Sequence, residues 1–395
     1  MDEVLPSASR SKFPVLLEAA RSLAAEIEAA RGDLDRRRRL PPVLVERMRA
    51  TGIFGLWLPK GLGGPELNVL DYIRIIEELA RHDGSVAWCA SIAASYSRLA
   101  GYLGPDVAAI IFEGGRSLLA GTLNPSGKAV SVAGGYRVTG RWAYGSGIEH
   151  STWTIGNCIV QDGDKPRRDA SGAPEVRLMI FPTSATEIID TWHVGGLRGT
   201  GSQDYRVADL FVPRDHSLEG FTPTPTIPGT LYALPMTTVF GVSIAAVPLG
   251  IARAAIDTFV ELSQSKASTG SPTLLRDKPA IQAAVGHAES LLRSARAFLF
   301  DTVQDLWDEV EDGAPASMKK RALVRLANAQ AAAASAQAVD LMYNAGGGTS
   351  VYETCRLERC FRDVHAATQH IAVATSNYEM SGRVLLGLDP GTARF

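Results

Sequence analysis

The residue pattern of the chain changes twice, and these changes limit the folds that it can adopt. Before about residue 117, apolar residues recur at helical spacing, as in FPVLLEAARSLAAEIEAARGDLD. From there to about residue 215, stretches such as GGYRVTGRWAYGSGIEHSTWTIGNCIV alternate and contain closely spaced glycines, which is typical of antiparallel strands. Long helical patterns return from about residue 236. The order helices, strands, helices, with no visible repeat, predicts an α+β fold.

Three domains are expected from these changes. A helical domain should cover residues 1–117, a β-barrel or β-sandwich domain residues 118–228, and a helical bundle residues 229–395. The Pro/Thr-rich segment FTPTPTIPGTLYALP, residues 221–235, is the expected linker between the last two domains. Residues 318–345 are rich in alanine, which favours either close packing in a four-helix bundle or an exposed helix of high propensity.

Composition and charge exclude several kinds of partner. The 395 residues are 46% hydrophobic and 21% charged, with a net charge of −2, so no nucleic-acid or membrane partner is expected on electrostatic grounds. The four cysteines form no CxxC pattern and no secretory signal is recognised, which predicts reduced thiols in a cytoplasmic protein. We expect no membrane span, because no apolar run approaches the ~20 residues that one requires.

Several nucleotide-binding and catalytic motifs are absent from the sequence. There is no GxGxxG after a predicted strand and no GxxxxGK[ST]. The GxSxG and HExxH patterns are also missing. A redox enzyme with this sequence is therefore not expected to bind a nicotinamide dinucleotide in the usual way.

Two histidines lie close together near the end of the chain, in the segment RDVHAATQH. His365 and His370 are five positions apart, which separates them by about 140° around a helix. A zinc pair on one helix needs a spacing of three or four residues. The two side chains therefore cannot share a metal, no metal site is expected, and at most one of them faces a pocket.

Three longer motifs resemble the acyl-CoA dehydrogenase superfamily. They are GGYRVTGRWAYGSGIEHSTW at residues 134–153, VGGLRGTGSQDYRVADLFVP at residues 194–213 and LERCFRD at residues 357–363. Together with the domain order, the resemblance covers nearly the whole chain. It implies an N-terminal helical domain, a central antiparallel β domain and a C-terminal four-helix bundle, with a flavin between the last two and usually a homotetramer.

The motifs resemble one branch of this superfamily more closely than the other. Acyl-CoA dehydrogenases need a carboxylate base, but the matching residues 370–373 read HIAV, with Ile371 at the position of the glutamate, and the segment that binds the adenine half of FAD is missing. The two-component flavin-dependent monooxygenases carry W-x-x-x-S-G, here residues 142–147, the loop at residues 197–202, and a histidine seven residues after Asp363, here His370.

This resemblance implies an oxygenase component that hydroxylates an aromatic or heteroaromatic small molecule through a flavin hydroperoxide. A separate NAD(P)H:flavin reductase would supply the reduced flavin, and O2 would be the co-substrate. Reduced FMN is favoured because the adenine-binding segment is not recognisable, and FADH2 is the alternative. The competing interpretations are an FAD-dependent acyl-CoA dehydrogenase, an N-oxygenating monooxygenase and a catalytically inactive binding subunit.

Two residues are assigned catalytic roles by the resemblance. Ser146 would donate a hydrogen bond beside the reactive flavin nitrogen, although it also fits a turn serine. His370 would act on the substrate as a base near neutral pH, although it also fits a buried structural histidine. His365 is interpreted as structural, and His150, in GIEHSTW, as a residue that braces its loop.

The remaining candidates contact the substrate or the flavin. The substrate-binding candidates on the segment GSVAWCASIAASYSRL are Trp88, Tyr96 and Ser97. Tyr96 takes the place of a second histidine found in several monooxygenases of this type. The cofactor-binding candidates, each with a structural alternative such as a core aromatic or a helix-ending glycine, are Leu123, Asn124, Trp142, Tyr144, Gly145, Ser146, Gly147, Lys266, Gly346 and Gly347. Arg276 is a second candidate for the flavin phosphate.

Overall fold

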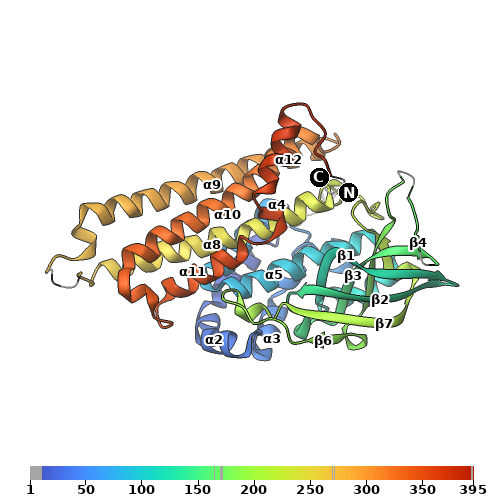
Figure 1. The fold of residues 1–395 in the computed structure, drawn as a ribbon, viewed down its shortest axis with the longest axis horizontal. Helices are drawn as coiled ribbons and strands as arrows, with labels where there is room; N and C mark the ends of the chain where they lie inside the picture. The colour runs from blue at the N-terminus through green and yellow to red at the C-terminus, as the bar shows by residue number, and fades with distance from the viewer. Residues whose placement is uncertain (1–10, 164, 170–171, 269, 271, 393–394) are drawn as a thin grey trace, which may run out of the picture.

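A central sheet separates two helical parts of the chain. The computed structural model describes residues 11–163, 165–169, 172–268, 270, 272–392 and 395. Figure 1 shows the sheet at one end of the molecule and the long C-terminal helices extending away from it, with α5 between them. The N-terminal helices are α1 (Phe13–Ser22), α2 (Ala24–Arg37), α3 (Pro42–Thr51), α4 (Val69–His82), α5 (Gly84–Ser97) and α6 (Pro105–Phe112).

The central part is a single mixed sheet with the strand order β6-β7-β2-β1-β3-β5-β8, and β4 pairs with β3. Its strands are β1 (Leu119–Val132), β2 (Gly135–Gly145), β3 (Trp153–Asp162), β4 (Lys165–Pro166), β5 (Val176–Pro182), β6 (Glu187–Ile189), β7 (Gln203–Pro213) and β8 (Ser217–Glu219). The expectation of a wholly antiparallel sheet is wrong for one pair, because β1 and β3 run parallel. The chain leaves β2 through residues 146–152 and returns beside the start of β1.

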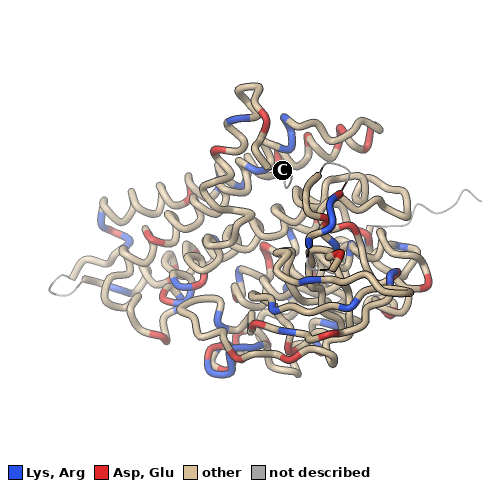
Figure 2. The backbone as a smooth tube through the Cα atoms, turned by 45° about the vertical axis from the view of Figure 1, so that its right-hand side comes forward, with Lys and Arg blue, Asp and Glu red and all other residues tan. Residues whose placement is uncertain are grey.

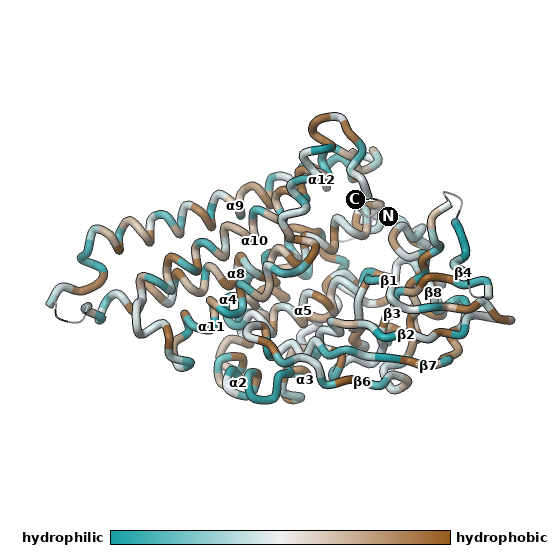
Figure 3. Tube along the Cα trace, viewed as in Figure 1, coloured by the Kyte–Doolittle hydropathy of each residue, from teal (hydrophilic) through white to brown (hydrophobic). Residues whose placement is uncertain are grey.

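The C-terminal part is a bundle of long helices, as the sequence predicted. Its helices are α7 (Thr230–Ala233), α8 (Met236–Ser263), α9 (Pro279–Glu311), α10 (Met318–Gly346), α11 (Arg356–Ala367) and α12 (Ser376–Leu385). α10 packs against α8, α9 and α11, and many of its alanines are buried, which agrees with close helix packing. In Figure 3, α9 alternates between hydrophobic and hydrophilic segments, as expected for a helix with one exposed face.

Helix α8 contradicts the expectation that no apolar run of the chain is long enough for a membrane span. Its 28 residues are long and apolar enough for a membrane span by length and composition. However, 89% of its most apolar window is buried inside the protein, so the helix packs in the core. Charges of both signs are interspersed along the chain in Figure 2, in agreement with the small net charge of −2.

Helix α5 is buried along its whole length. All of its residues are buried, and it contacts α4, α8, α11 and β1. A helix without an exposed face has no room for long charged side chains, and its sequence GSVAWCASIAASYS contains none. The position of α5 between bundle and sheet allows its side chains to reach residues of both.

Candidate active site

Helix α5 connects predicted site residues from different parts of the chain. The helix begins after Asp83, whose Oδ1 accepts hydrogen bonds from two backbone N–H groups of the first turn. Nε1 of Trp88 then donates to Oγ of Ser146 at 3.1 Å. The Trp88 ring also lies 5.7 Å from the His370 ring, measured between centroids. Trp88 therefore contacts both Ser146 and His370.

Three hydroxyl groups form a chain of hydrogen bonds whose direction is set at its ends. Oγ of Ser146 lies 2.7 Å from Oγ of Ser202, which lies 2.7 Å from Oγ1 of Thr200. Thr200 donates to the carbonyl of Leu197 at 2.9 Å, and a carbonyl can only accept. Because each hydroxyl has one proton, Ser202 must donate to Thr200, and Ser146 must donate to Ser202. At the other end, the N–H of Trp88 donates to Ser146.

Ser146 consequently has no proton left for another partner. Its proton points to Ser202, and one of its two acceptor positions receives the indole N–H. The second acceptor position receives no hydrogen bond from a described residue, so it can accept one from a bound molecule. The sequence predicted that Ser146 donates a hydrogen bond to the flavin. This arrangement of hydroxyls favours the opposite direction, in which Ser146 accepts.

His370 lies outside the helix on which the sequence placed it. α11 ends at Ala367, and His370 precedes the short 3-10 helix Ile371–Val373. Its Nδ1 accepts a hydrogen bond at 3.1 Å from the backbone N–H two residues later. Its ring lies 5.8 Å from the ring of Phe240 on α8, on the side of the site that the bundle supplies. The helical angle between the two histidines therefore does not apply, because the chain has left the helix.

The surroundings of His370 favour a neutral imidazole that donates a hydrogen bond. Burial lowers the pKa of His370 to about 4, so the ring is uncharged near neutral pH. Since Nδ1 accepts the backbone N–H, the one proton of the neutral ring is on Nε2. Among the described residues, none forms a hydrogen bond with Nε2. The base expected from the sequence does not fit this geometry, whereas a hydrogen-bond donor does.

His365 stays on α11 and has structural contacts. Its Nε2 lies 2.8 Å from Oδ1 of Asp340 on α10. Its ring packs edge-on against Phe361, with centroids 4.7 Å apart. The contact with Asp340 joins α11 to α10, and the contact with Phe361 lies within α11, which agrees with the structural interpretation of His365.

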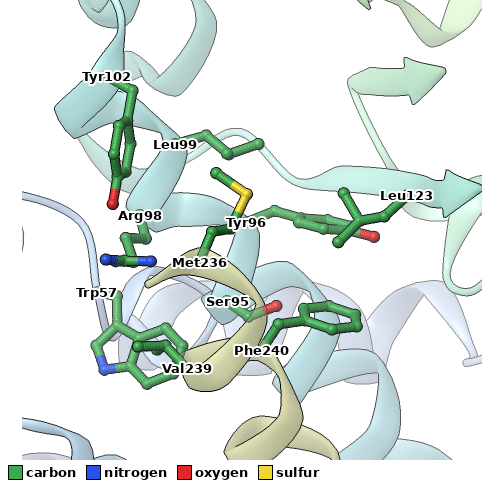
Figure 4. A pocket seen from close by; sticks show the side chains of 10 residues that line it. All are labelled: Trp57, Ser95, Tyr96, Arg98, Leu99, Tyr102, Leu123, Met236, Val239 and Phe240. Carbon is green, nitrogen blue, oxygen red and sulfur yellow. The ribbon is translucent and has the colours of Figure 1, made fainter. Parts of the chain in front are cut away.

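Phe240, whose ring lies 5.8 Å from that of His370, lines an apolar cavity, and Figure 4 shows the side chains that form its wall. The space inside it that a water-sized sphere can reach is about 20 Å³, much less than the ~300 Å³ of a typical ligand pocket, so a bound ligand would have to displace some of its lining side chains. Tyr96 and Phe240 form part of its wall and stack with ring centroids 5.9 Å apart. The Tyr96 hydroxyl donates to a backbone carbonyl of β1 at 3.1 Å. Ser97 does not line the cavity, and its hydroxyl donates to a carbonyl of its own helix.

A buried ion cluster holds the loop that carries the hydroxyl chain. Oδ1 of Asp363 accepts a hydrogen bond at 2.7 Å from the N–H of Leu197, which has a left-handed φ of +52°. Nε of Arg359 lies 2.7 Å from a carboxylate oxygen of Asp83 and 3.7 Å from one of Asp363. Burial raises the pKa of Asp363 to about 7, opposed by Arg359. The cluster joins α5, α11 and the loop, and sequence reasoning assigned its members no role.

Comparison with known proteins agrees with this architecture. The model of the acyl-CoA dehydrogenase N-terminal domain matches residues 15–101, and that of the acyl-CoA dehydrogenase C-terminal domain matches residues 242–375. An indole-3-acetate monooxygenase from Pseudomonas putida is 32% identical over 386 residues, which cover 97% of this chain and 95% of the relative. The chain belongs to the acyl-CoA dehydrogenase family.

Solved structures include matches to nearly the whole fold. XiaF from Streptomyces sp., in complex with FADH2 and glycerol, has a TM-score of 0.90 at 25% identity, with 97% of this chain and 98% of XiaF covered. The HsaA monooxygenase from M. tuberculosis has a TM-score of 0.87 at 27% identity, with 97% of this chain and 100% of HsaA covered. The resemblance and the fold class predicted from the sequence motifs are confirmed.

XiaF was solved with FADH2, but in the present chain the predicted flavin contacts near Ser146 are not all available. Leu123 lines the cavity, and the ring of Tyr144 is 67% exposed beside Trp192. Trp142, in contrast, is fully buried. It stacks on Tyr205 with centroids 5.4 Å apart, and its N–H donates to a backbone carbonyl of β3 at 2.8 Å. Trp142 is therefore a core residue of the sheet and cannot flank a flavin.

The other candidates near Ser146 shape the backbone. Asn124 is exposed, and its N–H donates to the Thr122 hydroxyl at 3.3 Å. Gly145 is buried where β2 ends. Gly147 has a φ of +75°, and its N–H donates to the carbonyl of Thr200 at 2.8 Å. This last bond holds the Ser146 loop against the loop of the hydroxyl chain.

Three phosphate-binding candidates lie together at the far end of the bundle. Lys266 Nζ donates to the carbonyl of Gly346 and to the hydroxyl of Thr349, and Gly347 follows with a φ of +58°. Lys266 lies beyond the end of α8, which rises about 35 Å between Phe240 and its last residue. Figure 1 shows this end of α8 far from the sheet. The group is therefore separated from Ser146 within one chain.

Arg276 lies in the same region as Lys266. Its Nη1 donates to Oε1 of Gln264 at 2.6 Å, and its Nε lies 3.7 Å from a carboxylate oxygen of Asp277. The side chain is exposed, and both of its partners are close in the sequence. These contacts give no reason to prefer Arg276 over Lys266 as the ligand of the flavin phosphate.

Replacing Ser202 with alanine is expected to weaken the binding of reduced flavin about tenfold. The change removes the acceptor of the Ser146 proton, so Ser146 can turn its O–H toward the site and oppose an N–H donor there. The measurement is anaerobic titration of reduced FMN and reduced FAD. Ser97→Ala is the control, since it removes a buried hydroxyl on α5 that bonds only its own helix. Equal affinities of all three proteins would contradict the direction assigned to the chain.

His150 should make the protein less stable as the pH falls. Burial lowers the pKa of His150 to about 4, and its Nε2 is buried without a described hydrogen-bond partner. Between that pH and the ordinary value near 6.5, the unfolded chain binds a proton that the folded chain does not, so the free energy of unfolding decreases as the pH falls. From about pH 7.5 to about pH 5, Tm should fall more for the parent protein than for His150→Asn. Parallel Tm curves would refute the assignment.

Proposed function

We propose that this chain is the oxygenase component of a two-component monooxygenase that uses reduced flavin and O2 to hydroxylate an aromatic or heteroaromatic small molecule. The observation that carries the proposal is the contact of Trp88 with both Ser146 and His370, together with the contact of His370 with Phe240, which lines an apolar cavity. None of the ten residues lining that cavity is acidic, so the carboxylate base of a dehydrogenase has no counterpart there. Ile371, at the matching position, is 66% exposed.

The residues at this site fit a reduced flavin. When bound, reduced flavin supplies the electrons that activate O2. The free acceptor position of Ser146 suits the N–H group that a reduced flavin ring carries and an oxidised ring lacks. The Nε2–H of His370 is placed to donate to the substrate or to the oxygen being transferred. The apolar wall excludes water, which limits the loss of O2 as hydrogen peroxide.

Two partners of the enzyme are inferred from features that a single chain does not provide: a dinucleotide-binding motif and a phosphate ligand near Ser146. A separate NAD(P)H:flavin reductase would supply the reduced flavin, because the sequence contains no dinucleotide-binding motif. Lys266, Gly346 and Thr349 can meet a flavin phosphate if a second copy of the chain places them against the Ser146 site, which supports a homotetramer. We place the enzyme in the cytoplasm, without a nucleic-acid or membrane partner. The preference for FMN over FAD stays a prediction.

The test combines the purified protein with a flavin reductase, NADH, flavin and 18O2. Phenols and indoles are supplied as substrates, and products are analysed by mass spectrometry. The proposal expects one 18O atom in a hydroxylated product, bound to a ring carbon. An N–OH product would establish the N-oxygenating alternative. Tightly bound FAD with reduction of a dye by an acyl-CoA would establish a dehydrogenase, and no flavin binding at all would indicate a binding subunit.

A further inference from the structure

Arg98 is a buried cation in the wall of the cavity and has no acidic partner. The residue is 3% exposed and lies directly after α5, two positions from Tyr96. None of the other lining residues is acidic, and Arg98 forms no salt bridge with a described residue. Burying a charge without a counter-ion is costly, and proteins normally pair such a group.

The hydrogen bonds of Arg98 leave one of its nitrogens free. Nε donates to the carbonyl of Leu231 at 3.0 Å, and Nη2 donates to the carbonyls of Leu231, Tyr232 and Leu234. The guanidinium also lies over the ring of Tyr102, 5.3 Å from its centroid. Nη1 donates to none of the described residues and is not among the fully buried atoms without a partner, so part of its surface is accessible, and the residue lines the cavity.

The rest of the cavity wall suits an aromatic ring. Figure 4 shows the guanidinium between the rings of Tyr102 and Trp57, with Met236 and Phe240 further along the wall. The hydroxyls of Tyr96 and Tyr102 both donate to backbone carbonyls and are not free to donate to a ligand. Among the described lining residues, Nη1 of Arg98 and Nε1 of Trp57 are donors without a partner, and Nη1 is the one that carries positive charge.

We propose that Arg98 binds the carboxylate of an aromatic acid whose ring lies against Phe240 and Tyr96, toward His370. This inference rests on the proposed function and names the class of its substrate. The carboxylate would accept from Nη1 and supply the negative charge that the cavity lacks. The aromatic ring would then extend along the wall toward the residues that contact Trp88.

A purely structural role for Arg98 predicts a different ligand preference. Its bonds to Leu231 and Leu234 hold the segment that leads into α8, and this role needs no ligand. In that case, a carboxylate would bind no better than its neutral amide, because nothing in the cavity would distinguish them. The two roles can therefore be separated in the unmodified protein.

The first measurement compares three acids with their amides in the parent protein. The pairs are indole-3-acetate, 4-hydroxyphenylacetate and benzoate, each against its primary amide, and binding is measured by calorimetry at neutral pH. At least one acid should bind about tenfold more tightly than its amide or better, and added salt should reduce the difference. If no acid binds more tightly than its amide, the inference is wrong.

Two variants then assign the preference to Arg98. Arg98→Met should abolish the preference for the acid, and Arg98→Lys should keep part of it, since a lysine retains the charge but not the bonds to the backbone. A preference that survives in a folded Arg98→Met protein would place the anion elsewhere and overturn the assignment. If Arg98→Met does not fold, Arg98→Lys still tests the inference. Loss of the hydrogen bonds to the backbone carbonyls alone would weaken the binding of the acid and of the amide equally.

The same samples distinguish this inference from the proposed function. Products are measured with reduced flavin and O2 for the acid and the amide. Tighter binding of the acid without any hydroxylated product would retain the anion site and reject the monooxygenase. Hydroxylation with equal affinities for acid and amide would retain the monooxygenase and reject the anion site.

Discussion

Replacing His370 with alanine is expected to lower the rate of hydroxylation about 100-fold or more while leaving the oxidation of reduced flavin by O2 intact. The variant loses the Nε2–H donor, the one polar group that His370 presents to the site. Electrons delivered by the flavin should then appear as hydrogen peroxide instead of product. The measurement is the ratio of hydroxylated product to hydrogen peroxide for each flavin oxidised.

Two further variants show how His370 acts. His370→Asn keeps an oxygen that can accept the backbone N–H and an amide group that can donate, so it should recover part of the coupling. A base could not be replaced in this way, and equal failure of the Asn and Ala variants would restore the base role. His365→Ala, on α11 and bonded to Asp340, is the control and should hydroxylate at the parent rate.

Replacing Arg359 with methionine should destabilise the protein by about 3–5 kcal/mol, because it leaves two buried carboxylates without their cation. The side chains of Asp83 and Asp363 are 0% and 3% exposed, and both approach Arg359. The measurement is the midpoint of unfolding in urea. Arg206→Met is the control, because the pair of Arg206 and Glu187 is more than half exposed and should contribute less than about 1 kcal/mol.

The effect of Arg359→Met should extend to the active site. The Asp363 carboxylate also holds Leu197, from which the hydroxyl chain to Ser146 begins. Coupling of flavin oxidation to hydroxylation should therefore fall at temperatures where the variant remains folded. Asp363→Asn keeps an oxygen for the Leu197 N–H and should retain more coupling. If Arg359→Met is as stable as the control, the cluster does not have the energetic role assigned to it.

The order of the secondary structure could be predicted because it depends on local patterns. Alternation and helical spacing identified the helices, the strands and the return to helices in α8. The parallel pairing of β1 with β3 could not be predicted in this way, because it depends on the path of the chain between strands. The apolar run of α8 is long enough for a membrane span by length and composition, and only its burial identifies it as a core helix.

The site could be predicted as a set of residue types but not as an arrangement. The motifs identified Ser146 and His370, yet the direction of their hydrogen bonds depends on Ser202 and on a backbone N–H. Trp142 matched the motif and proved to be a core residue, since a pattern cannot tell which face of a strand a ring occupies. Arg98 could not be identified from the sequence, because its lack of an acidic partner is a property of the folded chain.

The burial of α5 on all sides has a consequence for how substrate preference can change. Trp88 and Arg98 are attached to one continuous helical segment, about 15 Å apart along its axis, so the distance between the residue that contacts Ser146 and His370 and the proposed anion site is constant. No single substitution can lengthen that span. Evolution or engineering toward larger or smaller aromatic acids should therefore proceed by exchanging side chains of α8, such as Met236 and Val239, which border the same space from the opposite side.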